Sequence, residues 1–428
     1  MTESPLLFVN AAQVVTCAGP ARARVGKEMA DAVAQAGVAV LVNGSTISAV
    51  TDEAELRAAW PDATVVDCAQ GLLTPGFVDS HTHAIFGRGR FEEQEMRAAG
   101  ISYLEIARRG GGIHASVRDL RSSADDHLYA LARERLRALA AAGVTTVEVK
   151  SGYGLSLEDE LRTLHIIRRL SETLPMRIVP TFLGAHEIPL EYRDRESGRR
   201  EYVELLVQEM IPAVAQSQLA RFADVFCEPG VFTVAESREI LTAARQAGLG
   251  IKLHADELAA GGGAELAAEL RATSADHLAA VTDEGIRALS SAGTVATLLP
   301  GTMLFLGKTK QAPARALIDA GCAVALATDF NPGTSPTTDF PLILTLGVSQ
   351  LHLTAGEAIL AGTVNGAAAL GLAARVGQIA PGFSADLCLW NLSDVRELPY
   401  WYGGQRCAAS WTRGKPCHVH DLALSSLR

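Results

Sequence analysis

Four residues with metal-ligating side chains follow short apolar runs of the sequence. His81 and His83 end GFVDSHTH, His254 follows GIKL, and Asp329 follows AVALAT. Residues two apart on a strand point to the same face, so His81 and His83 can reach one cation. Three imidazoles and a carboxylate suit zinc or iron and leave a position for water. Each residue alone is ordinary core or turn chemistry, but buried polar groups gathered without partners are costly. Together they predict a metal site.

Other ionisable residues follow the same kind of run. Glu257 comes three residues after His254 in HADE, within reach of a metal-activated water whose proton it could take. The alternative for Glu257 is an acid that favours a helix N-terminus. His277 lies at the end of TSADH and is either a site residue or a satisfied core histidine, and Tyr153 and His186 end two further runs.

An arginine lies near the histidine pair. Arg90 stands seven residues beyond His83 and could hold a substrate carboxylate with two parallel hydrogen bonds. A solvated loop charge is the alternative, and Arg88 is a rival for the role.

Short β-branched runs must position these residues, and helical stretches separate the runs. The alternation predicts a parallel sheet with crossover helices. Eight units over roughly 250 residues favour a closed (β/α)8 barrel over an open doubly wound sheet, with the active site at the carboxyl ends of the strands. The runs cover residues 76–83, 145–154, 177–187, 222–230, 250–257, 273–280, 294–301 and 323–333.

The two ends of the chain have a different pattern. Residues 1–70 and 375–428 carry strand-like runs separated by Gly, Pro, Asn and Asp. Neither end has enough strands for a stable sheet by itself. We expect the ends to pair into one small β-sandwich domain beside a catalytic barrel of residues 71–374.

Lys150 raises the question of a second metal. A carbamylated lysine that bridges two metals would stand on the fourth barrel strand, which here reads VFCEPG and has no lysine. Lys150 ends the second run instead. We therefore predict a single-metal site and an ion-paired role for Lys150.

Composition restricts the class of function. The 428 residues carry 38 Lys+Arg against 48 Asp+Glu, a net charge of −10, with no basic block. This argues against a nucleic-acid or anionic-membrane partner and for a small molecule. Seven scattered cysteines without a CxxC pair, and no signal peptide, indicate the cytoplasm. The uncharged stretch 288–307 is expected to form a short strand and a loop rather than a membrane span.

Several motifs resemble the amidohydrolase superfamily. They are PGFVDSHTH, HADE, ATDFNPG and the closing VGQIAPGFSADLCLW. Longer segments resemble one branch of the superfamily over essentially the whole chain, namely HTHAIFGRGRFEEQEMRAAGISYLEIARRGGGI, EVKSGYGL, TFLGAHEIP, KLHADEL, SADHL and ATDFNPGTSP.

The resemblance implies hydrolytic opening of 4-imidazolone-5-propanoate to N-formimidoyl-L-glutamate in histidine degradation. It implies one divalent or trivalent ion, zinc ahead of iron, on His81, His83, His254 and Asp329. A homodimer is implied as well. Glu257 and Asp329 would shuttle the proton to the leaving nitrogen, and His277 or His186 would bind the carbonyl oxygen or the water. The implied substrate contacts are Arg90, Tyr153, His186, Glu257, Asn331, Gly333 and Thr334.

Two other functions fit parts of the pattern. The same ligand set suits deamination of a purine, pyrimidine or similar ring, which would release ammonia. A non-catalytic scaffold on the same fold is a more distant alternative, because all four ligands are present.

Overall fold

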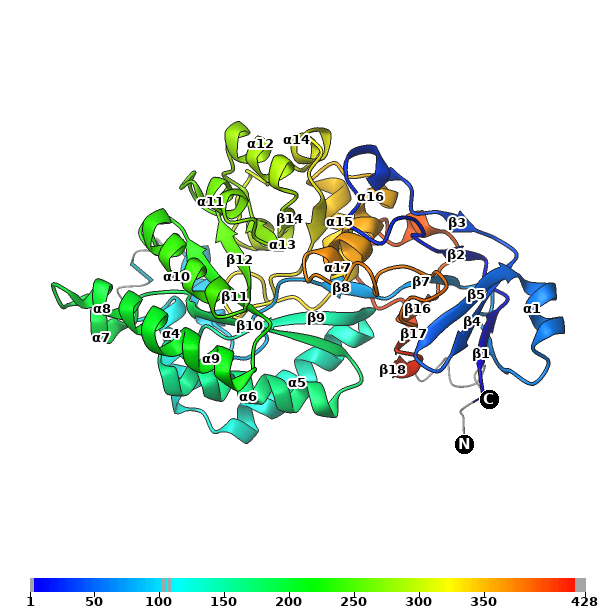
Figure 1. The fold of residues 1–428 in the computed structure, drawn as a ribbon, viewed down its shortest axis with the longest axis horizontal. Coiled ribbons are helices and arrows are strands. Elements are labelled where there is room, and N and C mark those ends of the chain that lie inside the picture. Colours follow the sequence, from blue (N-terminus) through cyan, green and yellow to red (C-terminus); the bar gives the residue numbers. More distant parts are fainter. Residues whose placement is uncertain (1–3, 102–104, 107–108, 420–428) are drawn as a thin grey trace.

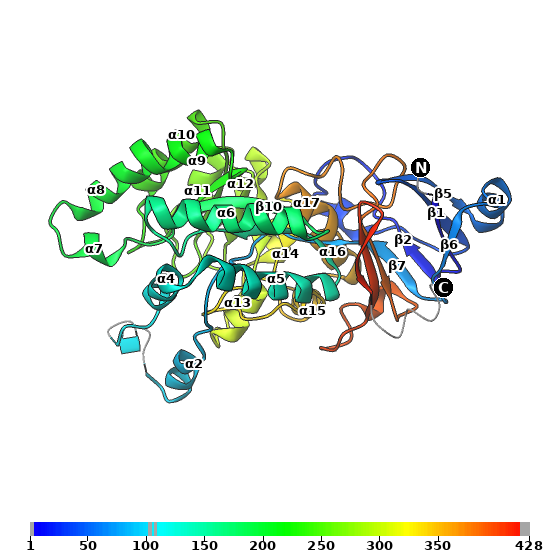
Figure 2. The ribbon, with the colours of Figure 1, turned by 90° about the horizontal axis from the view of Figure 1, so that it is seen from below.

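The computed structural model describes residues 4–101, 105–106 and 109–419. Figures 1 and 2 show a barrel surrounded by helices, with the strands of the two chain ends gathered beside it.

All eight predicted runs form strands of one parallel sheet, in chain order. Beyond the strand ends, a parallel bridge joins Thr82 to Phe330, and the Asp329 N–H donates to the His81 carbonyl at 3.0 Å. The first and last strands thus meet, and the predicted barrel is confirmed as a nearly closed one. Its strands are β8 (Phe77–Asp79), β9 (Val144–Lys150), β10 (Arg177–Ala185), β11 (Phe222–Cys227), β12 (Gly250–Ala255), β13 (Ser274–His277), β14 (Val295–Leu298) and β15 (Val324–Leu326).

Helices cover the outside of the barrel, and side-chain caps define where several begin. Ser156 accepts from the Asp159 N–H at the start of α6, and Thr233 forms a reciprocal capping box with Glu236 at the start of α10. The helices after the first strands are α2 (Phe91–Ala98), α4 (Ile113–Ser122), α5 (Asp125–Ala141), α6 (Leu157–Thr173), α7 (Leu190–Arg193), α8 (Gly198–Leu205), the π-helical η2 (Leu206–Met210), α9 (Ile211–Ser217) and α10 (Val234–Gln246).

The later helices complete the outer layer. They are α11 (Gly263–Glu269), α12 (Asp283–Ala292), α13 (Pro300–Phe305), α14 (Ala314–Asp319), α15 (Phe340–Ser349), α16 (Ala355–Leu360), the π-helical η3 (Ala361–Asn365) and α17 (Gly366–Ala368).

The stretch 288–307 differs from the expected strand and loop. It contains the end of α12, then β14 and then α13, in which Pro300 occupies the first turn, where its missing N–H costs nothing. Among the described residues, no helix is both long and apolar enough to cross a membrane.

The chain ends form two further sheets. One has the order β5 (Thr46–Asp52), β4 (Val38–Asn43), β1 (Leu6–Val9), β6 (Thr64–Asp67). The other has the order β18 (Lys415–Val419), β17 (Cys407–Thr412), β16 (Leu387–Trp390), β7 (Leu72–Pro75), β2 (Gln13–Val15), β3 (Ala34–Gln35). The two sheets share one apolar core, in which Phe8 and Trp411 meet edge to face with ring centroids 4.9 Å apart. The ends therefore form a sandwich.

Short additional helices lie within the end segments. They are η1 (Gly26–Ala30), α1 (Glu53–Ala59) and η4 (Val395–Glu397). The domain boundaries at residues 70 and 375 stay a prediction, and β7, just beyond residue 70, pairs with β16 and β2 of the end sheet.

Trp390 joins the end sheet to the barrel. Its ring lies 5.3 Å from that of Phe77, which stacks on Phe340 at 4.9 Å, and its indole N–H donates to Thr74 at 2.9 Å. A Cβ at Gly143 would lie only 2.4 Å from Trp390, so this close approach requires glycine. The barrel floor is thus packed against the sandwich.

Candidate metal centre

The four predicted ligands converge at the carboxyl ends of three strands. The Nε2 atoms of His81 and His83 are 3.3 Å apart, and those of His83 and His254 are 3.4 Å apart. Asp329 Oδ1 lies 3.5 Å from Nε2 of both His81 and His83. All four side chains are buried. The ligand atoms of His81, His83 and Asp329 therefore converge, with His254 beside His83.

The backbone after β15 aims Asp329 into this cluster. Asp329 has φ +51°, a left-handed conformation that few non-glycine residues adopt and that tends to occur at functional sites. Thr302 donates to Oδ2 at 2.6 Å, so Oδ1 is left facing the histidines. Asp79 ties the neighbouring strands together, since it accepts from Thr328 through N–H at 3.0 Å and Oγ1 at 2.6 Å.

The polar atoms of the cluster would be better satisfied by a cation than by one another. Burial lowers the pKa of His81 and of His83 well below the usual value, so both imidazoles are neutral. Three ring nitrogens and a carboxylate oxygen that face one another cannot all be satisfied by ring protons. His81, His83 and Asp329 offer ligand atoms close enough together to hold one metal ion, and His254 Nε2 lies 3.4 Å from that of His83, so an ion bound here would satisfy them.

Glu257 and His277 stand beside the cluster. Glu257 Oε2 lies 3.6 Å from His277 Nδ1, and the Glu257 side chain is 11% exposed. Burial, with the nearby Asp329 and Glu228 carboxylates, raises the pKa of Glu257 to about 8. The helix-terminus alternative for Glu257 is wrong, because α11 begins only at Gly263. Both His277 ring nitrogens lack a hydrogen-bond partner among the described residues, so the satisfied-core alternative for His277 is wrong too.

His186 has a ring orientation that the backbone determines. Its Nδ1 lies 2.9 Å from the Gly152 carbonyl oxygen, which can only accept, so Nδ1 carries the proton and Nε2 is a bare acceptor. Burial lowers the pKa of His186 to about 3, and its ring stacks on His83 with centroids 5.1 Å apart. The Tyr153 ring lies 5.4 Å from that of His186, so both residues border the cluster.

The structure separates the two candidate arginines. The Arg90 side chain is 11% exposed, with Nε 3.1 Å from Glu93 Oε1, whereas that of Arg88 is 62% exposed and pairs with Glu92. Gly333 lies directly against Arg90, because a Cβ there would be 2.1 Å from Arg90 Nη2. Arg90 is thus the inward-facing member of the pair.

Asn331 builds the loop that carries Gly333. Its Oδ1 accepts from the N–H groups of Gly333 at 2.8 Å and Thr334 at 2.7 Å, and its Nδ2 donates to the Asp329 carbonyl at 2.7 Å. Asn331, Gly333 and Thr334 therefore shape this loop beside Arg90. Direct contacts of these three residues with substrate stay a prediction.

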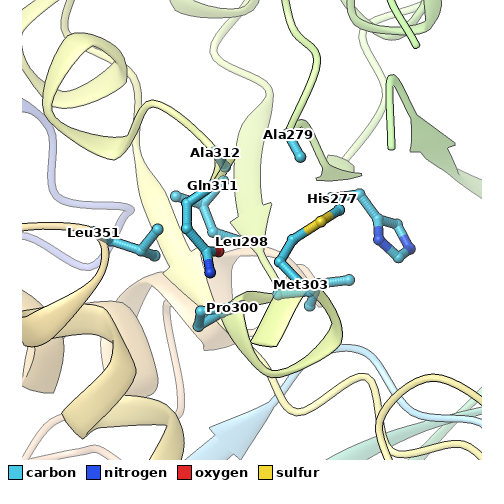
Figure 3. Close-up of a pocket in the computed structure, with 9 residues that line it drawn as sticks. His277, Ala279, Leu298, Pro300, Met303, Gln311, Ala312 and Leu351 are labelled. Atoms are coloured by element: carbon cyan, nitrogen blue, oxygen red, sulfur yellow. The ribbon is translucent and has the colours of Figure 1, made fainter. Parts of the chain in front are cut away.

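A small pocket adjoins the cluster (Figure 3). In this view the Met303 side chain extends toward His277, and Gln311 lies on the opposite side. The lining of the pocket is otherwise mostly apolar and includes Leu298 and Pro300. Of the residues named above as candidate site residues, only His277 lines it, so the pocket lies beside the metal centre rather than over it.

Sequence reasoning missed a set of charged residues below the histidines. Lys150 is ion-paired as predicted, with Nζ 2.7 Å from both Glu148 Oε2 and Asp224 Oδ2. Lys252 and Asp276 complete the set. A period-2 signal was available, since Lys252 precedes His254 by two residues and Glu148 precedes Lys150 by two.

The chain matches a known family over most of its length. Residues 72–416 match the model of the amidohydrolase family. The chain is 48% identical to an imidazolonepropionase of Symbiobacterium thermophilum, with 97% of each chain covered. It is 46% identical to that of Geobacillus kaustophilus, covering 93% of this chain and 94% of the relative. It is 44% identical to that of Solibacter usitatus, covering 97% and 98%.

Solved structures resemble the whole chain at lower identity. An adenosine deaminase from Xanthomonas campestris with bound zinc superposes with a TM-score of 0.72 at 20% identity, covering 99% of this chain and 96% of the other. A 5-methylcytosine deaminase from Klebsiella pneumoniae gives 0.72 at 18%, covering 97% and 98%. At such identities the likeness concerns the fold alone.

Proposed function

The chain belongs to the amidohydrolase family and, within it, to the imidazolonepropionases, and we propose that it opens the ring of 4-imidazolone-5-propanoate by hydrolysis, yielding N-formimidoyl-L-glutamate. It is a metal-dependent hydrolase acting on a carbon–nitrogen bond of a small cyclic substrate. The observation that supports the proposal is a group of buried His and Asp side chains able to hold a metal, with Glu257 at its edge and an inward-facing arginine nearby.

A single cation, zinc ahead of iron, would be held by His81, His83, His254 and Asp329. When bound, it supplies Lewis-acid polarisation of the ring carbonyl and lowers the pKa of a water that it binds. Lys150 is engaged by two carboxylates at 2.7 Å, which supports one metal and no carbamate bridge.

Glu257 would move the proton. A carboxyl group whose pKa is near neutrality can take a proton from water and deliver it within one turnover. The leaving ring nitrogen needs that proton when the carbon–nitrogen bond breaks. Asp329, whose pKa burial raises to about 6, would share the transfer.

The two remaining histidines would have different tasks. Within the described part of the chain, neither ring nitrogen of His277 has a hydrogen-bond partner, so His277 can donate to the carbonyl oxygen as negative charge develops. His186 donates Nδ1–H to Gly152, so only its Nε2 can face a ligand, and it must accept. His186 would therefore bind an O–H or N–H of water or substrate, and the carbonyl oxygen would go to His277.

Arg90 would bind the propionate of the substrate. A planar guanidinium can make two parallel hydrogen bonds to a carboxylate. Tyr153, Asn331, Gly333 and Thr334 would border the same end of the substrate. With the cation, Arg90 would supply positive charge at the site of a chain whose net charge is −10.

The cellular setting is part of the proposal. All seven cysteines are free, which suits a reducing cytoplasm. We expect a homodimer with no nucleic-acid or membrane partner. Sedimentation of the purified chain tests the dimer, and a monomer would contradict it.

Turnover tests the activity. Purified protein with one metal per chain should consume 4-imidazolone-5-propanoate without releasing ammonia, and should leave a panel of purines and pyrimidines unchanged. Ammonia from a nucleobase without imidazolone opening would indicate a deaminase instead. Purified protein that binds no metal would favour a scaffold.

A further inference from the structure

Five fully buried charged side chains form a connected group inside the barrel, below the histidine cluster. We call Lys150, Lys252, Glu148, Asp224 and Asp276 the lysine–carboxylate network. Lys150 Nζ lies 2.7 Å from Glu148 and 2.7 Å from Asp224. Lys252 Nζ lies 3.0 Å from Glu148 and 3.5 Å from Asp276. All five side chains are 0% exposed.

The network touches the candidate metal ligands from behind. Asp276 Oδ2 is 2.7 Å from His81 Nδ1, on the side of the ring away from the cluster. Asp224 Oδ2 is 3.1 Å from His254 Nδ1, and its Oδ1 accepts from the His254 backbone N–H at 3.2 Å. Of the three histidines that face the cation position, His81 is thus hydrogen-bonded to a network carboxylate through its ring, and His254 through its backbone N–H.

We propose that Asp276, which lies against Lys252 and Lys150, is a positioning residue that holds His81 with Nδ1 protonated and Nε2 bare toward the cation, and that Asp224, paired with Lys150, positions His254 through its backbone N–H. An ionised carboxylate can only accept, so the ring nitrogen facing it must donate. A neutral imidazole has one proton, and therefore its other nitrogen presents a lone pair. Carboxylates behind ligand histidines fix the ring orientation and increase ligand basicity.

Further hydrogen bonds hold the network carboxylates in place. Ser274 donates to Asp276 Oδ1 at 2.6 Å, and Thr181 donates to Glu148 Oε1 at 2.5 Å. Lys252 also donates to the Ser80 carbonyl at 2.8 Å, next to His81 in the chain. Rotation of the His81 ring would break a bond to a carboxylate that has no freedom to follow it.

The lysines also account for why one metal suffices. His81, Glu148 and Asp276 are close enough together to hold a cation of their own. The ammonium groups of Lys150 and Lys252 already lie against these carboxylates, within 2.7–3.9 Å. The two ammonium groups thus occupy the place that a second cation would need.

The inference rests on the metal centre of the proposed function and is tested by zinc affinity rather than by turnover. Asp276→Asn should weaken zinc binding about 10- to 100-fold in a competition with a chromophoric chelator. The matched control is Glu357→Gln, a buried carboxylate that pairs with Arg315 at 2.9 Å on α16, away from the histidines. It should retain wild-type zinc affinity. Equal affinity of Asp276→Asn and wild type would overturn the inference.

A second measurement covers the case in which Asp276→Asn does not fold. Nitrogen-15 chemical shifts of His81 in metal-free wild-type protein should report a protonated Nδ1 and a bare Nε2. The opposite tautomer would overturn the inference whatever the variant does. If wild-type protein bound no zinc, the metal centre itself would be wrong, a result distinct from failure of the positioning role.

Discussion

Two adjacent groups of polar side chains are buried inside the barrel, and they differ in how their members are paired. The histidine cluster is the upper layer and the lysine–carboxylate network is the lower layer. In the lysine–carboxylate network, each ammonium group lies within 2.7–3.0 Å of a carboxylate. In the histidine cluster, ring nitrogens and a carboxylate oxygen face one another at 3.3–3.5 Å, and no lysine or arginine among the described residues is ion-paired with them. Unpaired polar groups in such an interior cost several kcal/mol. The contrast identifies the upper layer as the part built to receive an ion.

A substitution in the histidine cluster should lower the catalytic activity. Asp329→Asn removes the anionic ligand while preserving shape, and we expect kcat to fall by about 10²–10⁴-fold, since both the cation site and a proton carrier are affected. Steady-state kinetics at saturating substrate with added zinc measures it. Turnover within twofold of wild type would remove Asp329 from the site.

A substitution in the lysine–carboxylate network should lower the free energy of unfolding. Lys150→Met leaves Glu148 and Asp224 buried with one cation fewer, and breaking a buried ion pair on one side costs about 3–5 kcal/mol. Denaturant unfolding of the two proteins measures the loss. Lys308→Met, at an exposed position, is the control and should stay within about 0.5 kcal/mol. A similar loss of stability for both variants would contradict the claim that the buried ion pairs of Lys150 stabilise the fold more than an exposed lysine does.

A substitution at the proposed substrate-binding arginine, outside both layers, should change KM more than kcat. Arg90→Ala should raise KM about 10- to 100-fold with a smaller change in kcat, because a charge-assisted hydrogen bond contributes about 1.5–3 kcal/mol. Gly333→Ala should act in the same direction by displacing the guanidinium. Arg88→Ala is the matched control and should keep KM. An unchanged KM in Arg90→Ala would mean that another group binds the substrate carboxylate.

An outer ion pair provides the smallest expected effect. Burial raises the pKa of Glu236, but bonds from Arg199 and Thr233 outweigh it and leave that pKa lowered. A carboxylate with a lowered pKa in the folded state stabilises at neutral pH and loses this contribution as acid protonates it. Glu236→Gln should therefore cost about 0.2–1 kcal/mol at pH 7 and less at low pH. Unfolding curves at both pH values measure the difference, and an equal cost at both would contradict the sign.

The sequence predicted the eight strands because each is a short, largely buried run, and it singled out the four candidate ligands because they end such runs; that these four hold the metal stays a prediction. It did not predict the network, since Asp224 and Asp276 lie within strands whose partners are fixed only when distant strands align. His277 shows another limit. Strand alternation places it opposite to Asp276, but its φ of +80° breaks the alternation.

The pairing of β7 with β16 has a consequence for biosynthesis. Leu72 pairs with Trp390, so the strand that leads into the barrel lacks this neighbour until nearly the whole chain has left the ribosome. Contacts so distant in sequence form late, and an edge that waits for its partner is exposed to wrong pairing meanwhile. Truncation before residue 387 should therefore leave an aggregation-prone nascent chain, although every barrel strand has already been made.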